Sequence, residues 1–171
     1  MVSSAQAVSV GVATIEDLPG IVEILNEVAE NSIANFSTSP TTVTQRQSWF
    51  ERHEPTGPHR LLVARLGGSV LGFAASGPYR DDYDAFRETV EVSISLAPAA
   101  RRRGVGTLLY TDLFDRLVGE PVHVALAGIA LPNDASVTLH RKFGFSDVGT
   151  FREYARKNGQ YISSLWMQRV F

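Results

Sequence analysis

The sequence predicts an α/β fold in which one strongly twisted, mixed sheet of about six to seven strands is flanked by about four helices. Segments with alternating apolar and polar residues occur beside segments whose apolar residues recur at helical spacing. Hairpin-like strand pairs are also interleaved with strand–helix–strand crossovers, so the sheet should have both antiparallel and parallel neighbours. At 171 residues and 44% hydrophobic content, the chain is expected to form one domain over residues 1–171.

The first half begins with a strand and two helices. Residues 8–13 alternate weakly, and Thr14 then opens a capping box whose acidic partner is Asp17. Apolar residues at helical spacing carry the first helix to about residue 30, and a second helix is expected over about 43–52. The irregular stretch between these helices is polar and aromatic, which suits a loop at a pocket or a simple connector.

Three strands follow. Residues 60–65 and 69–76 flank Leu66-Gly67-Gly68, which is a hairpin signal. The strand at 89–96 alternates until Pro98 stops it, so that Glu91, Ser93 and Ser95 share one face. A polar loop separates this strand from the hairpin.

The second half alternates helices and strands. A helix with an apolar stripe runs to about residue 118, and the apolar segment 122–130 predicts a strand covered on both faces. Another helix begins at Asn133 and ends at Gly144. The last strands are expected at 145–148 and 161–170, the second after an Asn-Gly turn.

The loop Arg101-Arg102-Arg103-Gly104-Val105-Gly106-Thr107 is the strongest functional signal. Two glycines one residue apart let the backbone turn sharply and expose N–H groups at a helix start, where the helix dipole favours an anion. Three arginines add forked donors that match phosphate oxygens. The loop lacks the lysine of a Walker A motif and the third glycine of a dinucleotide fingerprint. The loop is therefore expected to bind the phosphate group of a ligand that these two motifs do not recognise. A plain turn followed by a basic helix cap also fits these residues.

Composition excludes several functions. With 16 basic and 18 acidic residues the net charge is −2, which supports neither a nucleic-acid nor a membrane partner. No apolar run reaches about 18 residues, and the first residues lack an export signal, so a cytoplasmic location is expected. The chain has no cysteine, and its four histidines show no H-x-x-x-H spacing, so no metal is expected. The absence of G-x-S-x-G disfavours a serine hydrolase.

The order arginine, two residues, glycine, one residue, glycine resembles the acetyl-CoA pyrophosphate loop of the GCN5-related N-acetyltransferases, the GNAT superfamily. The segment that begins with Asn133 is similar to that superfamily's second cofactor segment. His140 stands four residues before Gly144-Phe145, where much of the superfamily has tyrosine. The chain further resembles the phosphinothricin and methionine sulfone N-acetyltransferase branch, through Asn35-Phe36, Gly77-Pro78-Tyr79-Arg80, Ala85-Phe86-Arg87 and Thr89-Val90-Glu91.

This resemblance implies a GNAT-like fold that transfers an acetyl group from acetyl-CoA, the co-substrate, to the amine of a small amino-acid-like substrate carrying a phosphinate, sulfone or sulfoximine group. It implies Glu91 as general base, His140 as proton donor to the CoA thiolate, and an oxyanion donor in the backbone near Leu96. The implied acetyl-CoA contacts are Ile94, Leu96, Arg101, Arg102, Arg103, Gly104, Val105, Gly106, Thr107, Asn133 and Ser136. The implied substrate contacts are Asn35, Phe36, Arg80, Phe86 and Arg87, and a homodimer is implied as well.

Alternatives stay open at this point. Glu91 also fits a solvent-facing strand position, and His140 a packed helix histidine. The acceptor amine could belong to a polyamine, an aminoglycoside or a protein N-terminus. A non-catalytic acetyl-CoA sensor would need neither Glu91 nor His140, and a generic phosphate-binding module would not need the segment 133–145. The sequence therefore favours a small-molecule N-acetyltransferase.

Overall fold

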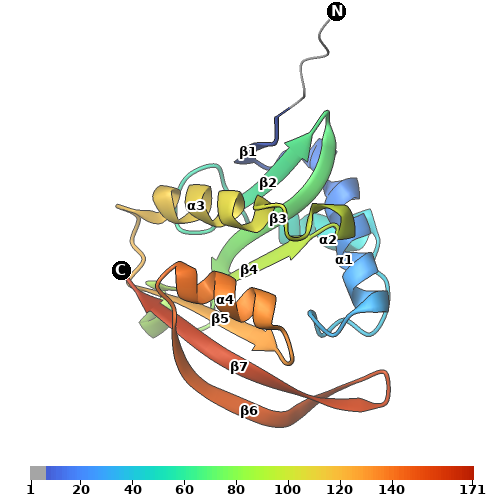
Figure 1. Ribbon diagram of the computed structural model, residues 1–171. Coiled ribbons are helices and arrows are strands. Elements are labelled where there is room, and N and C mark those ends of the chain that lie inside the picture. The colour runs from blue at the N-terminus through green and yellow to red at the C-terminus, as the bar shows by residue number, and fades with distance from the viewer. Residues whose placement is uncertain (1–6) are drawn as a thin grey trace, which may run out of the picture.

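The computed structural model describes residues 7–171 and contains one seven-stranded sheet with helices on both faces (Figure 1). Its strands are β1 (Ser9–Val12), β2 (Leu61–Leu66), β3 (Ser69–Pro78), β4 (Thr89–Leu96), β5 (Val124–Ala130), β6 (Ser146–Lys157) and β7 (Gln160–Val170). Its helices are α1 (Leu18–Asn31), α2 (Val43–Phe50), α3 (Val105–Leu117) and α4 (Asp134–Lys142). The predicted mixed α/β fold is confirmed. No helix within residues 7–171 is long and apolar enough to cross a bilayer.

The strand order in the sheet is β1-β2-β3-β4-β5-β7-β6. Within the described chain, β4 and β5 form the one parallel pair, and every other neighbouring pair is antiparallel. A parallel pair needs a crossover, and here the crossover is α3. The phosphate-loop candidate is the segment that leaves β4 and enters this crossover helix.

Each face of the sheet has its own apolar core. On one face, α3 and α4 supply Leu109, Leu113 and Val137 to a large cluster with the central strands. On the other face, α1 packs Ile21 and Ile24 against β2 and β3, with α2 beside it. Because the two helix pairs lie on opposite faces, a ligand that passes between strands of the sheet can contact both pairs.

The strands β4 and β5 separate after a short paired segment. Their register covers only Thr89–Glu91 against Val124–Leu126, although both strands continue beyond these residues. The carboxyl-terminal half of β4 therefore has β3 on one side and an opening toward β5 on the other. This opening positions the site described below.

The prediction for β6 was wrong in length. A short strand over 145–148 was expected, whereas the structure extends it from Ser146 to Lys157. Most of β6 is exposed, and its pairing with β7 is interrupted by two register shifts, one of them between Phe151 and Ala155. An edge strand held by backbone pairing has no need for alternating apolar residues, so this segment has no periodic pattern that would predict a strand.

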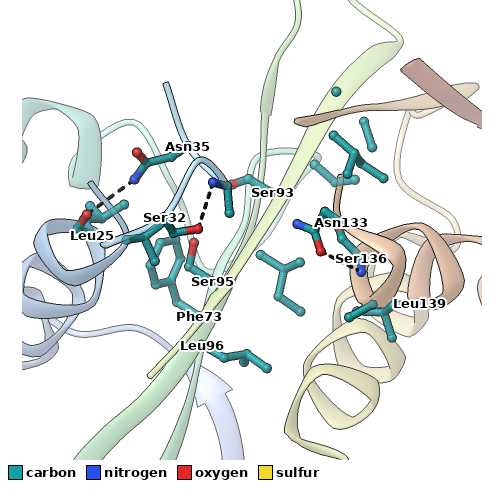
Figure 2. Close-up of a pocket in the computed structure, with 18 of the residues that line it drawn as sticks. Leu25, Ser32, Asn35, Phe73, Ser93, Ser95, Leu96, Asn133, Ser136 and Leu139 are labelled. Carbon is teal, nitrogen blue, oxygen red and sulfur yellow. Dashed lines mark hydrogen bonds between the residues drawn. The ribbon is translucent and has the colours of Figure 1, made fainter. Parts of the chain in front are cut away.

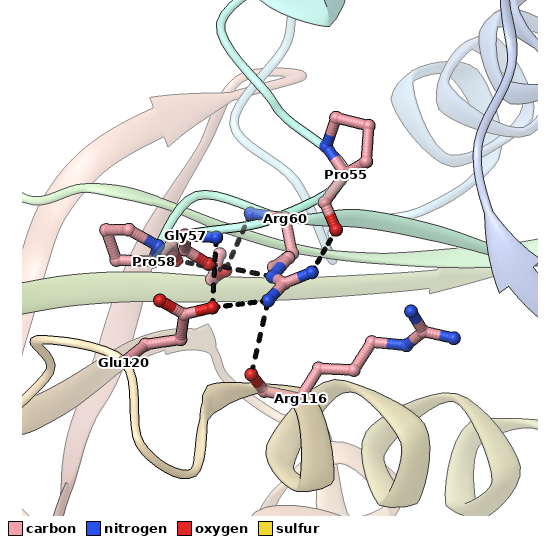
Figure 3. Close-up of polar contacts among 7 residues, drawn as sticks. Pro55, Gly57, Pro58, Arg60, Arg116 and Glu120 are labelled. Atoms are coloured by element: carbon pink, nitrogen blue, oxygen red, sulfur yellow. Dashed lines mark hydrogen bonds and ion pairs between the residues drawn. The ribbon is translucent and has the colours of Figure 1, made fainter.

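A buried arginine anchors the segment that leads into β2. Arg60 is 6% exposed, and its guanidinium donates to the carbonyls of Gly57 (2.7 Å) and Pro55 and to the Glu120 carboxylate (2.5 Å) (Figure 3). Glu120 also accepts from the Gly57 N–H at 3.0 Å. These bonds fix the connection before β2 to the end of α3, since they satisfy a charge that burial would otherwise make costly.

A second buried pair joins the start of α1 to the sheet. The Asp17 carboxylate accepts from Arg65 Nε at 2.7 Å and from the Thr14 N–H at 2.7 Å. Burial alone would raise the pKa of Asp17, but the hydrogen bonds and charge of Arg65, together with the Thr14 bonds, lower it below its ordinary value. The predicted capping role of Thr14 and Asp17 thus also serves an ion pair between α1 and β2.

Asp17→Asn should lower the free energy of unfolding at pH 7 by about 3 kcal/mol, because it leaves Arg65 without its counter-charge in a largely buried site. The folded-state pKa of Asp17 is lowered, so this stabilisation is complete above the unfolded-state pKa of about 3.9 and is lost as the pH falls through the folded-state pKa. Urea titrations at several pH values check this. The control Asp147→Asn removes an exposed pair with Arg141 and should cost about 0.5 kcal/mol or less. Equal losses in the two variants would contradict the prediction.

Candidate active site

A cleft of about 570 Å³ opens where β4 and β5 separate. One wall comes from α1, α2 and the loop between them, and the other from α4 and the end of β5 (Figure 2). The strand β4 crosses between these walls and lines the cleft from Glu91 to Leu96. The predicted residues that the structure brings together here are Asn35, Glu91, Ile94, Leu96, Arg101, Asn133, Ser136 and His140.

Glu91 is the last residue of β4 that pairs with β5, at the point where the two strands begin to separate, and it is half-buried. Burial raises the pKa of its carboxyl above the ordinary value. The same residue lines a second hollow of about 310 Å³, whose lining includes Trp49, His53 and Asp81. Glu91 thus lines both the main cleft and a second hollow and is not fully exposed.

His140 is 3% exposed and hydrogen-bonded at both ring nitrogens. Nδ1 lies 2.8 Å from the Ser136 carbonyl, which can only accept, so we assign the ring proton to Nδ1. Nε2 then accepts from the Tyr110 hydroxyl at 2.8 Å. Burial lowers the pKa of His140, although the Ser136 bond opposes this, so the ring is neutral at neutral pH. The sequence allowed His140 to be either a functional residue of the site or a packed helix histidine. Because His140 lines the cleft and is also buried, each interpretation describes part of its environment.

The basic loop turns directly into α3. Gly104 is the N-cap residue with φ of 79°, and a Cβ added there would meet nothing within 4 Å. The first turn of α3 contains no acidic residue, so its free N–H groups face no local negative charge. Arg102 and Arg103 are exposed, whereas Arg101 pairs with Glu27 at 2.6 Å and lines the cleft. This open, positively charged helix start is suited to an anion.

Gly106 and Val105 have packing roles within the same loop. A Cβ on Gly106 would lie 3.3 Å from Leu139 and 3.6 Å from both Ile94 and Leu96. Glycine therefore lets α3 approach β4 and α4 at the edge of the cleft. Val105 is 2% exposed and belongs to the core, so its side chain cannot reach a ligand. Its predicted contact would have to be made by the backbone.

The start of α4 presents polar groups to the cleft. Asn133 is the N-cap residue, and its Oδ1 accepts from the Ser136 N–H at 3.2 Å. That bond orients the carboxamide so that its nitrogen points toward the cleft (Figure 2). An amide nitrogen there can donate to the amide carbonyls of an extended ligand.

The opposite wall is held in place by a buried lysine. Lys157, at the end of β6, is 2% exposed. Its Nζ donates to the carbonyls of Ser32 (2.6 Å) and Asn35 (3.0 Å), and to Asn35 Oδ1 (3.3 Å). It also reaches the Val28 carbonyl near the end of α1 at 3.5 Å. The hairpin β6–β7 therefore fixes the loop that lines the cleft at Ser32 and Asn35.

Lys157→Met should lower the free energy of unfolding by about 2 kcal/mol, because buried carbonyls lose a charged donor. Urea unfolding measures the loss. Lys142→Met, at the other lysine of the chain, is the stability control because Lys142 is exposed. Unchanged stability in Lys157→Met would contradict the assigned bonds.

The remaining predicted substrate residues lie outside the cleft lining. Phe36 is 42% exposed and packs edge-on against Tyr154 at 5.8 Å. Arg80 stacks over Phe86 at 5.7 Å, and Arg87 pairs with Asp84 at 3.2 Å. Their roles in binding stay predictions. Thr107, a predicted acetyl-CoA contact, accepts from Lys142 Nζ at 3.4 Å.

Sequence reasoning missed several residues that the fold brings to the site. Arg46 and Trp49 line the cleft from α2, and their spacing of three residues places them on one helical face. That spacing was the feature of the sequence from which their shared position could have been predicted. Tyr110, which was assigned no role from the sequence, is a fully buried core residue of α3, and its hydroxyl also holds His140. No sequence pattern distinguishes such a tyrosine from an ordinary core residue.

Comparisons with known proteins agree with this geometry. Residues 21–145 match the Acetyltransferase (GNAT) family. Phosphinothricin N-acetyltransferase from Streptomyces coelicolor is 44% identical over 90% of this chain and 91% of that protein. L-methionine sulfoximine/L-methionine sulfone acetyltransferase from Pseudomonas paraeruginosa is 34% identical over 91% and 90% of the two chains.

A solved structure gives the same result for the fold. A GNAT superfamily phosphinothricin acetyltransferase from Sinorhizobium meliloti, in complex with acetyl-CoA, superposes with a TM-score of 0.90 at 28% identity, covering 96% of this chain and 88% of that one. The separated strands, the open start of α3 and the polar start of α4 thus occur in a chain whose relatives are acetyltransferases. This protein is an acetyltransferase that belongs to the GNAT family.

Proposed function

We propose that this enzyme transfers the acetyl group of acetyl-CoA to the amino group of a small amino-acid-like substrate of the phosphinothricin, methionine sulfone or methionine sulfoximine type. The observation that carries the proposal is the single cleft lined by Glu91, Asn133 and Arg101. A half-buried carboxylate, an amide donor and an arginine from the basic loop before α3 line this one space. The names of the relatives supply the substrate class.

The chain's own residues fit acetyl-CoA. The N–H groups of the first turn of α3 and the exposed Arg102 and Arg103 would hold its diphosphate, and the Asn133 amide would donate to its pantetheine arm. The apolar side chains of Ile94 and Leu96 line the channel between these two groups. When bound, acetyl-CoA supplies the activated acetyl group.

Glu91 acts on the acceptor amine. A primary ammonium must lose a proton before its nitrogen can attack, and Glu91 accepts that proton directly or through one water. Its raised pKa brings it closer to the working pH than an ordinary carboxyl group, which makes it a better match for proton transfer. The second hollow gives the accepted proton a route away from the cleft.

Two further groups complete the proposed mechanism. A backbone N–H near Leu96 donates to the acetyl oxygen as negative charge develops on it. His140, beside Ser136 at the cleft, passes to the departing thiolate the second proton of the amine, which the nitrogen loses as the tetrahedral intermediate collapses; the ring gains this proton before it gives it up and returns to the neutral form. The Ser136 carbonyl and the Tyr110 hydroxyl hold the ring in place for this transfer. The thiolate is a tolerable leaving group even before protonation, since the ordinary pKa of a thiol is about 8.5.

The proposal includes a homodimer in the cytoplasm. The edge strand β6 leaves Phe151 57% and Tyr154 47% exposed, and Phe36 packs against Tyr154. Neighbouring exposed aromatic side chains of this kind are typical of an interaction surface, and a second copy of the chain offers the same surface in return. Sedimentation equilibrium that gave the mass of a monomer at micromolar concentration would reject the dimer.

The substrate proposal is tested with a panel of amines. The enzyme is incubated with acetyl-CoA and each amine, and free thiol is measured with Ellman's reagent. Phosphinothricin, methionine sulfone and methionine sulfoximine should have kcat/KM at least about tenfold above spermidine, kanamycin and an N-terminal peptide. A higher value for any of the last three would replace the proposed substrate class, and no turnover with the first three amines would reject it.

A further inference from the structure

One cation in the cleft, Arg46, has no side-chain partner within residues 7–171. Arg46 projects from α2 and lines the cleft beside Trp49 and Asn35. Its Nε is buried and has no hydrogen-bond partner among the described residues. Arg46 also takes part in none of the ion pairs found within residues 7–171. Buried guanidinium N–H groups are normally satisfied, so this one indicates a missing acceptor.

The charges around the cleft show what kind of acceptor is missing. Among the described residues, Glu91 is the one acidic side chain in the lining. Arg101, the other arginine there, is already paired with Glu27 at 2.6 Å. Of the two arginines in this lining, Arg46 is thus the one whose positive charge is not paired with a carboxylate of residues 7–171, so it is available to bind a ligand. An anionic ligand satisfies it, and a carboxylate or phosphinate offers two oxygens that match the planar donors of a guanidinium.

The position of Arg46 separates it from the acetyl-CoA path. The Asn35 wall and the Asn133 wall lie on opposite sides of β4 (Figure 2). The anion-binding helix start of α3 and the Asn133 amide belong to the second wall, whereas Arg46 and Asn35 belong to the first. An anion at Arg46 therefore comes from the acceptor molecule.

We propose that Arg46 binds the carboxylate of the acceptor and so selects α-amino acids among primary amines. This rests on the acetyl transfer proposed above and deepens it, since it names the group that recognises the substrate class. An α-amino acid carries its carboxylate one carbon from the amine. Arg46 holds that carboxylate on the α2 side while Glu91, in the floor of the same cleft, takes a proton from the ammonium. Arg80 and Arg87, the arginines expected from the sequence, lie outside the lining and are engaged elsewhere.

The test compares methionine sulfone with its carboxamide, which keeps the shape and removes the negative charge. The wild-type enzyme should favour the acid over the amide in kcat/KM by about 30-fold or more, a preference of the size expected for a charge-assisted bidentate contact. Arg46→Met should bring this ratio close to one by losing activity toward the acid, while the KM of acetyl-CoA changes little. Arg46→Lys should keep part of the preference, because it keeps the charge without the fork.

The matched control is Arg116→Met, which removes a half-buried arginine that pairs with Asp112 at the far end of α3, outside the cleft lining, and should leave the preference intact. Arg46→Gln provides a second variant if the methionine variant does not fold, as judged by circular dichroism. If Arg46 variants lose activity toward acid and amide by the same factor, or lose none, Arg46 does not read the carboxylate. If the wild-type enzyme acetylates other amines but neither of these two compounds, the substrate proposal itself fails, and the inference about Arg46 fails with it.

Discussion

Glu91→Gln is expected to lower kcat by about 10²–10⁴-fold, the range that general-base catalysis commonly contributes. The amide keeps the size of the side chain and loses its ability to accept the proton of the ammonium group. Acetyl-CoA affinity should change by less than about threefold, since its proposed contacts lie at α3 and α4 rather than at Glu91. Thiol release gives kcat, and calorimetry gives the dissociation constant.

Glu88→Gln is the matched control. Glu88 precedes β4 by one residue and is exposed, so its substitution should leave kcat unchanged. If Glu91→Gln weakened acetyl-CoA binding as much as it lowered kcat, Glu91 would have a structural role and not a proton-transfer role.

The pH profile of the wild-type enzyme gives a second measure of the same group. Glu91 works as a base only when it is deprotonated, so kcat/KM should fall as the pH drops through its pKa. Because burial raises that pKa, the acidic limb should lie above the ordinary range of a glutamate. In Glu91→Gln this limb should disappear from the residual activity. A limb that persisted unchanged would assign the titration to another group.

Gly104→Val is expected to weaken acetyl-CoA binding by about 100-fold or more, because two or more charge-assisted hydrogen bonds to the diphosphate would be lost. The φ of 79° at Gly104 is strained for a β-branched residue, and the side chain would occupy the space through which phosphate approaches the N–H groups. Calorimetry with acetyl-CoA measures the loss. Normal affinity would remove the basic loop from the diphosphate site.

Gly119→Val separates backbone strain from loss of the ligand. Gly119 follows the other end of α3, has φ of 86°, and likewise has nothing within 4 Å of an added Cβ. Both variants should lose stability by about 1–2 kcal/mol, the cost of a left-handed conformation for an ordinary residue. Only Gly104→Val should lose acetyl-CoA. Similar affinity losses in the two variants would show that strain in α3, and not blocked access, causes the effect.

Local sequence patterns were sufficient to predict the helices and strands that bury an apolar face. The stripe of α3 and the alternation in β4 recur with the period of their secondary structure, so burial of one face could be inferred from spacing. The same spacing placed Glu91 on the face of β4 opposite Val90 and Val92. The resemblance then assigned roles to Asn133 and His140, and the structure places both in the cleft lining.

Sequence patterns failed to predict the part of the fold that is held by strand pairing and not by burial of an apolar face. The residues of β6 beyond 148 are mostly exposed and polar, and they form a strand because β7 supplies hydrogen-bond partners. No local pattern distinguishes Lys157, at the end of this strand, from a surface lysine. Only the hairpin's position over the end of α1 shows that it is buried among carbonyls.

The sequence by itself determined the fold class, the position of the basic loop before α3 and the position of Glu91 on β4, because each depends on residues close together in the chain; the proposed role of Glu91 as base came from the family resemblance. Only the tertiary structure decided which side chains meet in the cleft: Arg46 from α2, Asn35 held by Lys157, and His140 held by Tyr110. Contacts between residues more than a hundred positions apart, such as Lys157 with Asn35, follow from how the two helix layers and the strands pack. No local periodicity records that packing.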